Sequence, residues 1–319
     1  MTSKFALFYA VCLFLGRSAS AQELVKDINP SDSSHPTWLT PSNGKLFFTA
    51  SGETSGTELW ISDGTDEGTV MLKDIYPGNI GSHPNHLTDV NGTLFFNADD
   101  PTNGRELWKS DGTPEGTVMV KKIRANQYGS MPQNFISFNG SLFFTANDGV
   151  HGWELWKSDG TAQGTIIVKD IDQFSDAYPN ALTIANGILY FFAKGDELWQ
   201  SDGTTEGTTM VKNIHPGSSI IRLLTNVNGT LFFSGGQGGS SNDQQLWKSD
   251  GTEAGTVMLK DIGNTVPDGV VDDFTAVNGT LYFTTNDGIS GKELWKSDGT
   301  TAGTILVKDI NPGIAGSYF

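Results

Sequence analysis

Short apolar segments recur along the chain in a fixed order, separated by polar segments rich in glycine, asparagine and aspartate. Each repeat carries a leucine-aromatic segment such as 94–96, then Glu-Leu-Trp (Gln-Leu-Trp in the fifth repeat), and then a β-branched run such as 165–171. Successive tryptophans are 48 residues apart, with one interval of 43, and they are Trp60, Trp108, Trp156, Trp199, Trp247 and Trp295. A period of this size indicates one supersecondary unit that occurs six times.

Tight turns divide each unit into four short strands. Asn-Gly, which tolerates the positive φ of a type I′ hairpin turn, precedes every aromatic segment, at 43–44, 91–92, 139–140, 186–187, 228–229 and 278–279. Ser-Asp-Gly-Thr follows every tryptophan as a second turn, with the aspartates Asp63, Asp111, Asp159, Asp202, Asp250 and Asp298. The pattern predicts an antiparallel meander in each unit and almost no helix.

Apolar side chains occupy both faces of the predicted strands. Phe95 and Phe96 are adjacent and must point to opposite faces, as must Leu107 and Trp108. A sheet between two similar sheets needs two apolar faces, whereas a sheet with one face in water does not. We therefore predict an all-β fold, a β-propeller of about six four-stranded antiparallel blades, with a linear β-solenoid as the rival.

The two ends of the repeat array complicate the number of blades. Residues 24–30 read Leu-Val-Lys-Asp-Ile-Asn-Pro, and residues 306–312 repeat that sequence. Seven such outer-strand segments therefore stand beside six tryptophan segments, and residues 313–317 resemble the opening of a further unit. Either six blades form with one copy in surplus, or the chain is part of a larger ring.

The tryptophan and turn segments together resemble the ELWxxDGT-repeat family over nearly all of residues 24–317. The motif is intact at 58–65, 106–113, 154–161, 197–204 and 293–300, whereas Gln245 replaces its glutamate in the fifth copy. The resemblance implies secreted or surface proteins with propeller-like repeats and mostly unassigned function. A residue present in every unit usually packs that unit, so we interpret the six tryptophans and six aspartates as structural.

The first 21 residues have the features of a signal peptide. Lys4 precedes an apolar run at 5–16, and Ala-Ser-Ala at 19–21 resembles a cleavage site. The run is too short to span a bilayer. We therefore predict a secreted, extracellular protein with a single domain at 22–319. Cys12, the only cysteine, lies in the signal peptide, which excludes disulfides from the mature chain.

Acidic residues outnumber basic ones by 36 to 20, which gives a formal net charge of −16. Without residues 1–21, which contain the basic Lys4 and Arg17, the charge is −18. Nucleic acid and anionic membranes would be repelled. Calcium, basic proteins, extracellular-matrix components and neutral glycans are the remaining partners, and the charge would equally serve solubility.

Acidic loops supply the oxygen ligands that calcium prefers, so calcium is the one candidate cofactor. The candidate ligands lie in loops after the aromatic strands and after the third repeat, and they are Asp99, Asp100, Asn103, Asn147, Asp148, Asn286, Asp287, Asp170, Asp172 and Asp176. None matches an EF-hand, and the same residues suit ordinary turns. Four hairpin asparagines stand in Asn-x-Ser/Thr sequons and are glycosylation sites if the source is eukaryotic, namely Asn91, Asn139, Asn228 and Asn278.

Two tryptophans, Trp38 and Trp153, fall outside the repeat positions and are the better candidates for ligand contact. No histidine spacing indicates a metal site, and no nucleophile stands beside a base, so no catalytic residue is assigned. The sequence favours a secreted, acidic, non-enzymatic binding or extracellular-matrix protein, associated with calcium or mineral. The alternative is a carbohydrate-recognising propeller, either lectin-like or a glycosidase.

Overall fold

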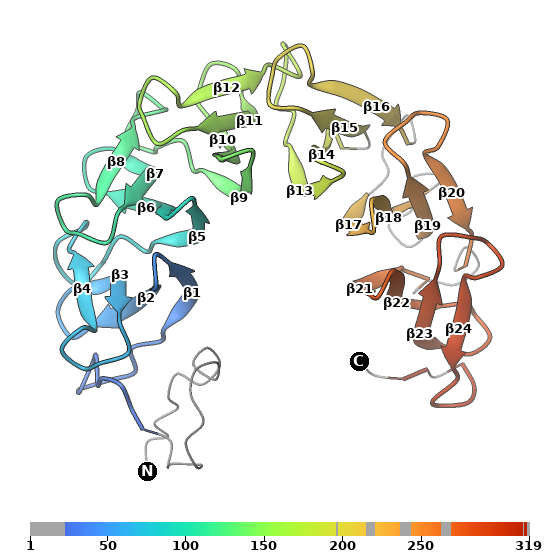
Figure 1. Ribbon diagram of the computed structural model, residues 1–319, viewed down its shortest axis with the longest axis horizontal. Helices are drawn as coiled ribbons and strands as arrows, with labels where there is room; N and C mark the ends of the chain where they lie inside the picture. Colours follow the sequence, from blue (N-terminus) through green and yellow to red (C-terminus); the bar gives the residue numbers. More distant parts are fainter. Residues whose placement is uncertain are drawn as a thin grey trace. The chain divides into compact units, whose positions relative to one another are not determined.

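A computed structural model describes residues 23–195, 197–214, 221–236, 244–262, 269–314 and 316–317. The predicted signal peptide and Cys12 lie outside these residues. Regular structure in the described residues is entirely β, and it forms six four-stranded antiparallel sheets (Figure 1). None of the described residues belongs to a helix that is long and apolar enough to cross a membrane.

Each sheet is a meander of four strands consecutive in the chain, and we number these sheets as blades 1 to 6. Blade 1 contains β1 (Thr37–Ser42), β2 (Lys45–Gly52), β3 (Gly56–Ser62) and β4 (Val70–Lys73). Blade 2 contains β5 (Asn85–Val90), β6 (Thr93–Asp100), β7 (Gly104–Ser110) and β8 (Val118–Lys121). Blade 3 contains β9 (Gln133–Phe138), β10 (Ser141–Asn147), β11 (Trp153–Ser158) and β12 (Ile166–Lys169).

The remaining three blades repeat this arrangement. Blade 4 contains β13 (Asn180–Ala185), β14 (Ile188–Ala193), β15 (Glu197–Ser201) and β16 (Thr209–Asn213). Blade 5 contains β17 (Arg222–Val227), β18 (Thr230–Gly236), β19 (Gln244–Ser249) and β20 (Val257–Lys260). Blade 6 contains β21 (Asp272–Val277), β22 (Thr280–Asn286), β23 (Lys292–Ser297) and β24 (Ile305–Lys308). The predicted all-β propeller fold with six four-stranded blades is confirmed.

Every Asn-Gly hairpin adopts the left-handed conformation that its sequence predicts. Asn43 and Gly44 have φ values of 48° and 73°, and Asn278 and Gly279 have values of 48° and 78°. Positive φ at both central residues defines the type I′ turn, whose twist matches that of the flanking strands. This turn fixes the register of the first two strands of each blade.

The chain divides by its internal contacts into two compact units, residues 1–150 with 158–165, and residues 151–157 with 166–319. In the first unit, the first strands β1, β5 and β9 lie side by side (Figure 1). In the second unit, β13, β17 and β21 do the same. Each first strand therefore lies next to the first strand of a neighbouring blade.

The core lies between neighbouring blades, as the two apolar strand faces predict. Phe47 and Leu59 of blade 1 belong to one buried cluster with Leu94, Phe96 and Trp108 of blade 2. In the second unit, blades 5 and 6 share an equivalent cluster. Both faces of β6 are buried, since the side chains of Phe95 and Phe96 point to opposite faces and are 2% and 0% exposed. Burial of both aromatic side chains supplies much of the hydrophobic stabilisation of each blade.

Candidate functional site

The Ser-Asp-Gly-Thr turn forms a closed network of hydrogen bonds. Asp63 Oδ1 accepts hydrogen bonds from the amide and hydroxyl of Thr65, at 2.9 and 2.7 Å. Ser62 Oγ accepts one from the Gly64 amide and shares another with the Thr69 hydroxyl. The same contacts of the aspartate recur in the other five turns. The motif aspartates therefore build the turn.

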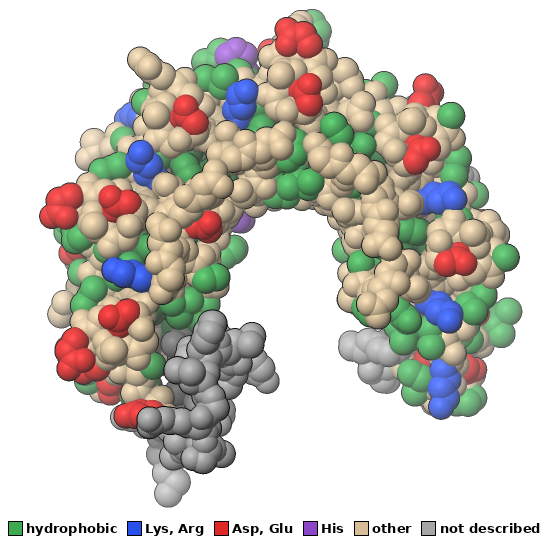
Figure 2. Space-filling model, viewed as in Figure 1, with side chains coloured by type: hydrophobic (Ala, Val, Ile, Leu, Met, Phe, Trp, Pro, Cys, Tyr) green, Lys and Arg blue, Asp and Glu red, His purple; other side chains and the backbone are tan. Residues whose placement is uncertain are grey.

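These six aspartates are also exposed. In Asp63, the hydrogen bonds from the Thr65 hydroxyl and amide lower the pKa of the carboxyl, because they favour its charged form. The same direction holds for the pKa of Asp111, Asp159, Asp202, Asp250 and Asp298. Each blade consequently presents a turn to solvent whose aspartate is ionised at neutral pH, and Figure 2 shows acidic side chains in separate small groups over the blades.

The motif glutamate holds the long connection to the next blade. Glu58 is fully buried and accepts hydrogen bonds from the amides of Tyr76 and Ser82, at 3.0 and 2.8 Å, and from the Ser82 hydroxyl. Burial raises the pKa of Glu58, and these hydrogen bonds oppose the rise. Glu106 and Glu293 have the same kind of partners, in which Ser130 and Ser317 replace Ser82.

Glu154 lacks the contacts that Ser82 makes with Glu58, because Ala177 takes the place of the serine and its amide donates to the Trp153 carbonyl at 3.1 Å. Its Oε2 accepts a hydrogen bond from the Ile171 amide at 3.1 Å, whereas its buried Oε1 has no partner among the described residues. Burial raises the pKa of Glu154 to about 8, and the nearby charges of Asp170 and Asp172 add to the rise. A glutamate of this pKa would suit a general acid, but the side chain is 0% exposed and out of reach of a substrate.

The predicted calcium loops use their oxygens to cap their own backbone. Asp100 Oδ1 accepts hydrogen bonds from the amides of Thr102 and Asn103 and from the Asn103 side chain, each at 2.8 Å, and Asp99 pairs with Arg105. The other loop residues accept hydrogen bonds from amides two or three residues further on, and they are Asn147, Asp148, Asn286 and Asp287. These are Asx-type turns.

Asp172 and Asp176 have separate roles in the second unit, and the buried Oδ1 of Asp170 has no partner among the described residues. Asp172 forms an ion pair with Lys194 at 3.4 Å, and Asp176 accepts a hydrogen bond from the Trp153 amide at 2.8 Å. Within the described residues, no group of three or more His, Cys, Asp or Glu side chains is placed to hold a metal ion.

The four sequon asparagines lie exposed at the hairpin tips. Asn91 Nδ2 donates to the Gly140 carbonyl of the next hairpin at 3.5 Å. Asn43 and Asn186, which are outside sequons, make shorter bonds of this kind, at 2.7 and 3.0 Å. In these three hairpins the asparagine therefore ties neighbouring blades together in addition to forming the turn.

An aromatic run crosses the first strands of the first unit. Trp38 of β1 contacts His86 of β5, with ring centroids 5.2 Å apart, and His86 stacks on Phe135 of β9 at 5.5 Å. Trp38 is 45% exposed, in agreement with its position outside the repeat pattern. Burial, followed by the charge of Arg105, lowers the pKa of His86, so this ring is neutral at physiological pH.

The sequence does not reveal this aromatic run, because an irregularity in the backbone of the first strands brings the rings together. Trp38 and His86 both have φ values of 56°, within stretches where the register of the first strand shifts. Such a bulge reorients the side chain. Trp153, the other candidate, is only partly exposed and stacks on Tyr178 with ring centroids 6.3 Å apart.

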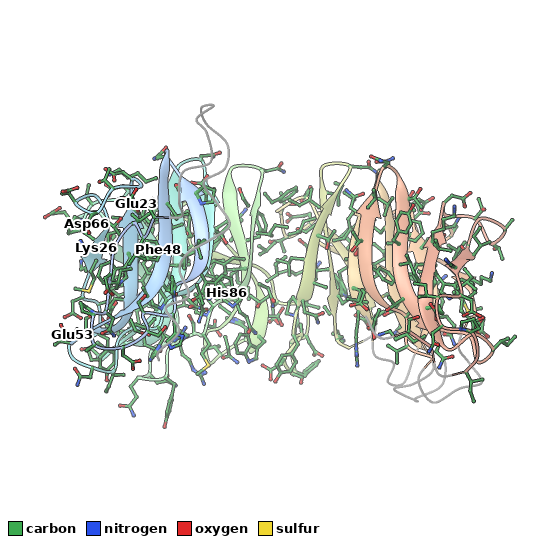
Figure 3. All side chains as sticks on the ribbon, turned by 90° about the horizontal axis from the view of Figure 1, so that it is seen from below. Glu23, Lys26, Phe48, Glu53, Asp66 and His86 are labelled. Atoms are coloured by element: carbon green, nitrogen blue, oxygen red, sulfur yellow. The ribbon has the colours of Figure 1, made fainter. Side chains whose placement is uncertain are left out.

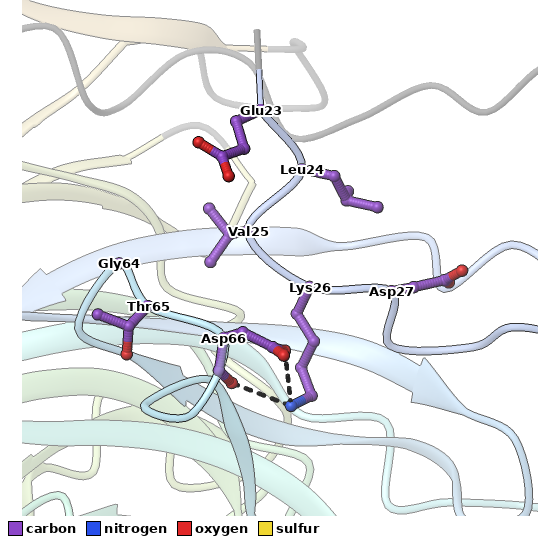
Figure 4. Close-up of a pocket in the computed structure, with 8 residues that line it drawn as sticks. All are labelled: Glu23, Leu24, Val25, Lys26, Asp27, Gly64, Thr65 and Asp66. Carbon is purple, nitrogen blue, oxygen red and sulfur yellow. Dashed lines mark hydrogen bonds and ion pairs between the residues drawn. The ribbon is translucent and has the colours of Figure 1, made fainter.

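A pocket of about 630 Å³ lies between the segment 23–27 and the turn 64–66 of blade 1 (Figure 4). Lys26 Nζ donates to the Asp66 carbonyl and contacts the Asp66 carboxylate, both at 3.0 Å. Figure 3 shows Glu23, Lys26 and Asp66 grouped together and well apart from His86. The residues 24–28, predicted from sequence as an outer strand, form no strand in this position.

No protein-family model matches this chain, and no curated protein matches it. Among solved structures, the chain is similar to the computationally designed Ika8 protein, with 14% identity and a TM-score of 0.50 over 87% of this chain and 75% of that one. It is also similar to a prolyl endopeptidase, with 10% identity and a TM-score of 0.53 over 86% of this chain. The match spans only 43% of the endopeptidase chain. At these identities the similarity establishes the fold alone.

Proposed function

We propose that this chain is a secreted, non-enzymatic binding protein of the ELWxxDGT-repeat type, whose acidic blades associate with a basic protein or matrix component. The observation that carries the proposal is the ionised turn aspartate that every blade exposes. Repetition at a fixed spacing suits a multivalent partner, because several weak contacts then act together.

The turn glutamates offer a way to test this without breaking the turn. Glu67, Glu115, Glu206 and Glu253 are exposed in turns of four different blades, and their side chains are outside the aspartate network. Replacing all four by glutamine removes four negative charges. We expect binding to a polylysine surface to weaken about fourfold or more, since each screened surface contact contributes roughly 0.2–1 kcal/mol. Unchanged binding, with an unchanged melting temperature, would contradict the proposal.

Calcium enters the proposal as a diffusely held counter-ion, because the loop carboxylates already cap their own amides. Diffuse association predicts equal effects of calcium and magnesium, both removed by added salt. A calcium-selective rise in melting temperature, reversed by chelator, would instead reveal a specific site. Glycosylation at Asn91, Asn139, Asn228 and Asn278 would be visible as a mobility change after endoglycosidase treatment.

A second candidate function, recognition of a neutral glycan, is favoured by the aromatic run. Trp38, His86 and Phe135 offer an uncharged stacking surface, and sugar rings stack on exposed aromatic faces. Trp38→Ala should abolish binding on a glycan array, whereas Trp153→Ala, outside the run, should leave it unchanged. Equal loss in both variants, or no glycan binding by the unmodified chain, would eliminate this candidate.

A further inference from the structure

The outer strands of blades 1 to 5 each attach to the next blade through a lysine. Lys121 Nζ donates to the Thr165 carbonyl in the following turn at 2.7 Å, and Lys260 donates to the Thr304 carbonyl at 2.6 Å. The equivalent bonds in the other blades are made by Lys73, Lys169 and Lys212. An isoleucine adds an apolar contact, since Ile75, which follows the first of these strands, packs in the cluster of the next blade's Phe96 and Trp108.

The segment 24–28 makes similar contacts with blade 1 although it belongs to no blade. Lys26 donates to the carbonyl of Asp66 in the first turn. This acceptor corresponds to Pro114, Thr205 and Glu253, the second and more distant acceptors of Lys73, Lys169 and Lys212. Ile28 packs against the cluster of Phe48 and Trp60, the counterparts of Phe96 and Trp108. The segment therefore occupies the site on blade 1 that the outer strand of a preceding blade would fill, and we call this site the blade 1 seat.

Blade 6 exposes the complementary surface. Val307 of β24 is 43% exposed and Ile310 is 54% exposed, whereas the equivalent Leu72 and Ile75 are 4% and 6% exposed. Val277 at the end of β21 is 45% exposed, although the equivalent Val227 is 5% exposed. Lys308 is exposed as well, and within the described residues no acceptor binds its ammonium group. We call Val277, Val307, Lys308 and Ile310 the open face.

The segment in the blade 1 seat and the outer strand of the open face have the same sequence. Residues 24–30 and 306–312 are identical at all seven positions. The seat is also incompletely filled, because the 630 Å³ pocket remains beside the segment (Figure 4), and the Lys26 side chain is 30% exposed. A strand with the same side chains and a whole blade behind it would fill the seat better.

We propose that the open face of blade 6 binds the blade 1 seat of a second copy of this chain, where residues 306–310 replace that copy's own residues 24–28. Lys308 of one copy then donates to the turn at 64–66 of the other. The contact is head-to-tail, so it leaves one seat and one open face for further copies. The segment 24–28 acts as an internal competitor that limits this assembly.

The test is sedimentation velocity of the full chain from about 1 to 200 μM, a range that covers weak association. We expect association that increases with concentration. Val307→Glu places a charge in the open face and should keep the chain monomeric. Val150→Glu is the matched control, because Val150 is 81% exposed in the loop between β10 and β11 and belongs neither to the open face nor to the seat, so association should stay unchanged.

Charge reversal supplies a test that does not depend on the apolar contact. Lys308→Glu should weaken association, since it opposes Asp66, and the double variant D66K/K308E should restore it. Lys26→Met should lower the dissociation constant by up to about fivefold, because the competing segment loses a surface ion pair. A chain that is monomeric throughout, or whose association survives Val307→Glu, would show that something other than a second copy covers the open face.

Discussion

Restoring the serine at position 177 should stabilise the protein, and the gain should grow with pH. Blades 1, 2 and 6 place a serine hydroxyl against the buried motif glutamate, and Ala177 removes it in blade 3. Ala177 is buried, as are Ser82 and Ser130, so a hydroxyl introduced there is shielded from solvent and needs an acceptor within the protein. Ala177→Ser therefore gives Glu154 the partner that its Oε1 lacks.

The magnitude follows from the pKa of Glu154. With a folded-state pKa of about 8 against an ordinary value of 4.5, the folded state binds the proton more tightly than the unfolded state. The stabilisation that proton binding by Glu154 contributes is complete below pH 4.5 and is lost as pH rises through 8. Between pH 4 and pH 7 the unfolding free energy falls by about 3 kcal/mol for this reason. A hydroxyl that donates to the ionised carboxylate should recover roughly 1.5–3 kcal/mol at pH 8 and less than about 1 kcal/mol at pH 5.

Urea denaturation followed by tryptophan fluorescence measures this difference at pH 5 and pH 8. Glu154→Gln provides the control, because glutamine carries no charge at either pH. In a double-mutant cycle, Ala177→Ser should give a pH-dependent gain in the unmodified chain and a pH-independent effect in the Glu154→Gln background. An equal gain at both pH values, or a pH-dependent gain that persists in that background, would refute the inference that a hydroxyl at position 177 stabilises the ionised carboxylate of Glu154.

Two further substitutions test the repeated contacts. Gly164→Ala would place a Cβ atom 2.2 Å from the Asp159 carboxylate and should displace this side chain from its hydrogen bonds. Urea denaturation should show a loss of about 2 kcal/mol in unfolding free energy. In an Asp159→Ala background the Gly164→Ala change should be nearly neutral. Lys260→Met removes a hydrogen bond to Thr304 and a cation–π contact of 5.4 Å with Trp295. It should lower the unfolding free energy by about 1–2 kcal/mol. Lys308→Met is the control and should have no effect at low protein concentration. Equal effects of the two lysine substitutions would contradict the role of Lys260 between blades.

Local sequence signals predicted most of the architecture. The Asn-Gly and Ser-Asp-Gly-Thr turns each require a particular backbone conformation within a few residues. Adjacent apolar residues such as Phe95 and Phe96 require burial on both faces of a strand. The repeated tryptophans and aspartates were predicted as structural, and the turn networks around Asp63 support that interpretation.

The candidate sites were harder to predict, because they combine residues from different repeats. Trp38, His86 and Phe135 meet only because three first strands lie side by side and bulges turn two of the rings. The orphaned oxygen of Glu154 depends on residue 177, which is 23 positions away in the sequence. No local pattern marks either contact.

The sequence by itself determined the repeat, the four-stranded meander and the turn types, because these depend on contacts and φ preferences between near neighbours in the chain. Only the tertiary structure decided what each repeated residue does, since identical sequences have different surroundings. Residues 24–28 lie on blade 1 outside any sheet, whereas their copy at 306–310 begins within β24 and exposes Val307, Lys308 and Ile310. The difference is physical: the first copy has a neighbouring blade against which to bury Ile28, and the second leaves Ile310 in solvent.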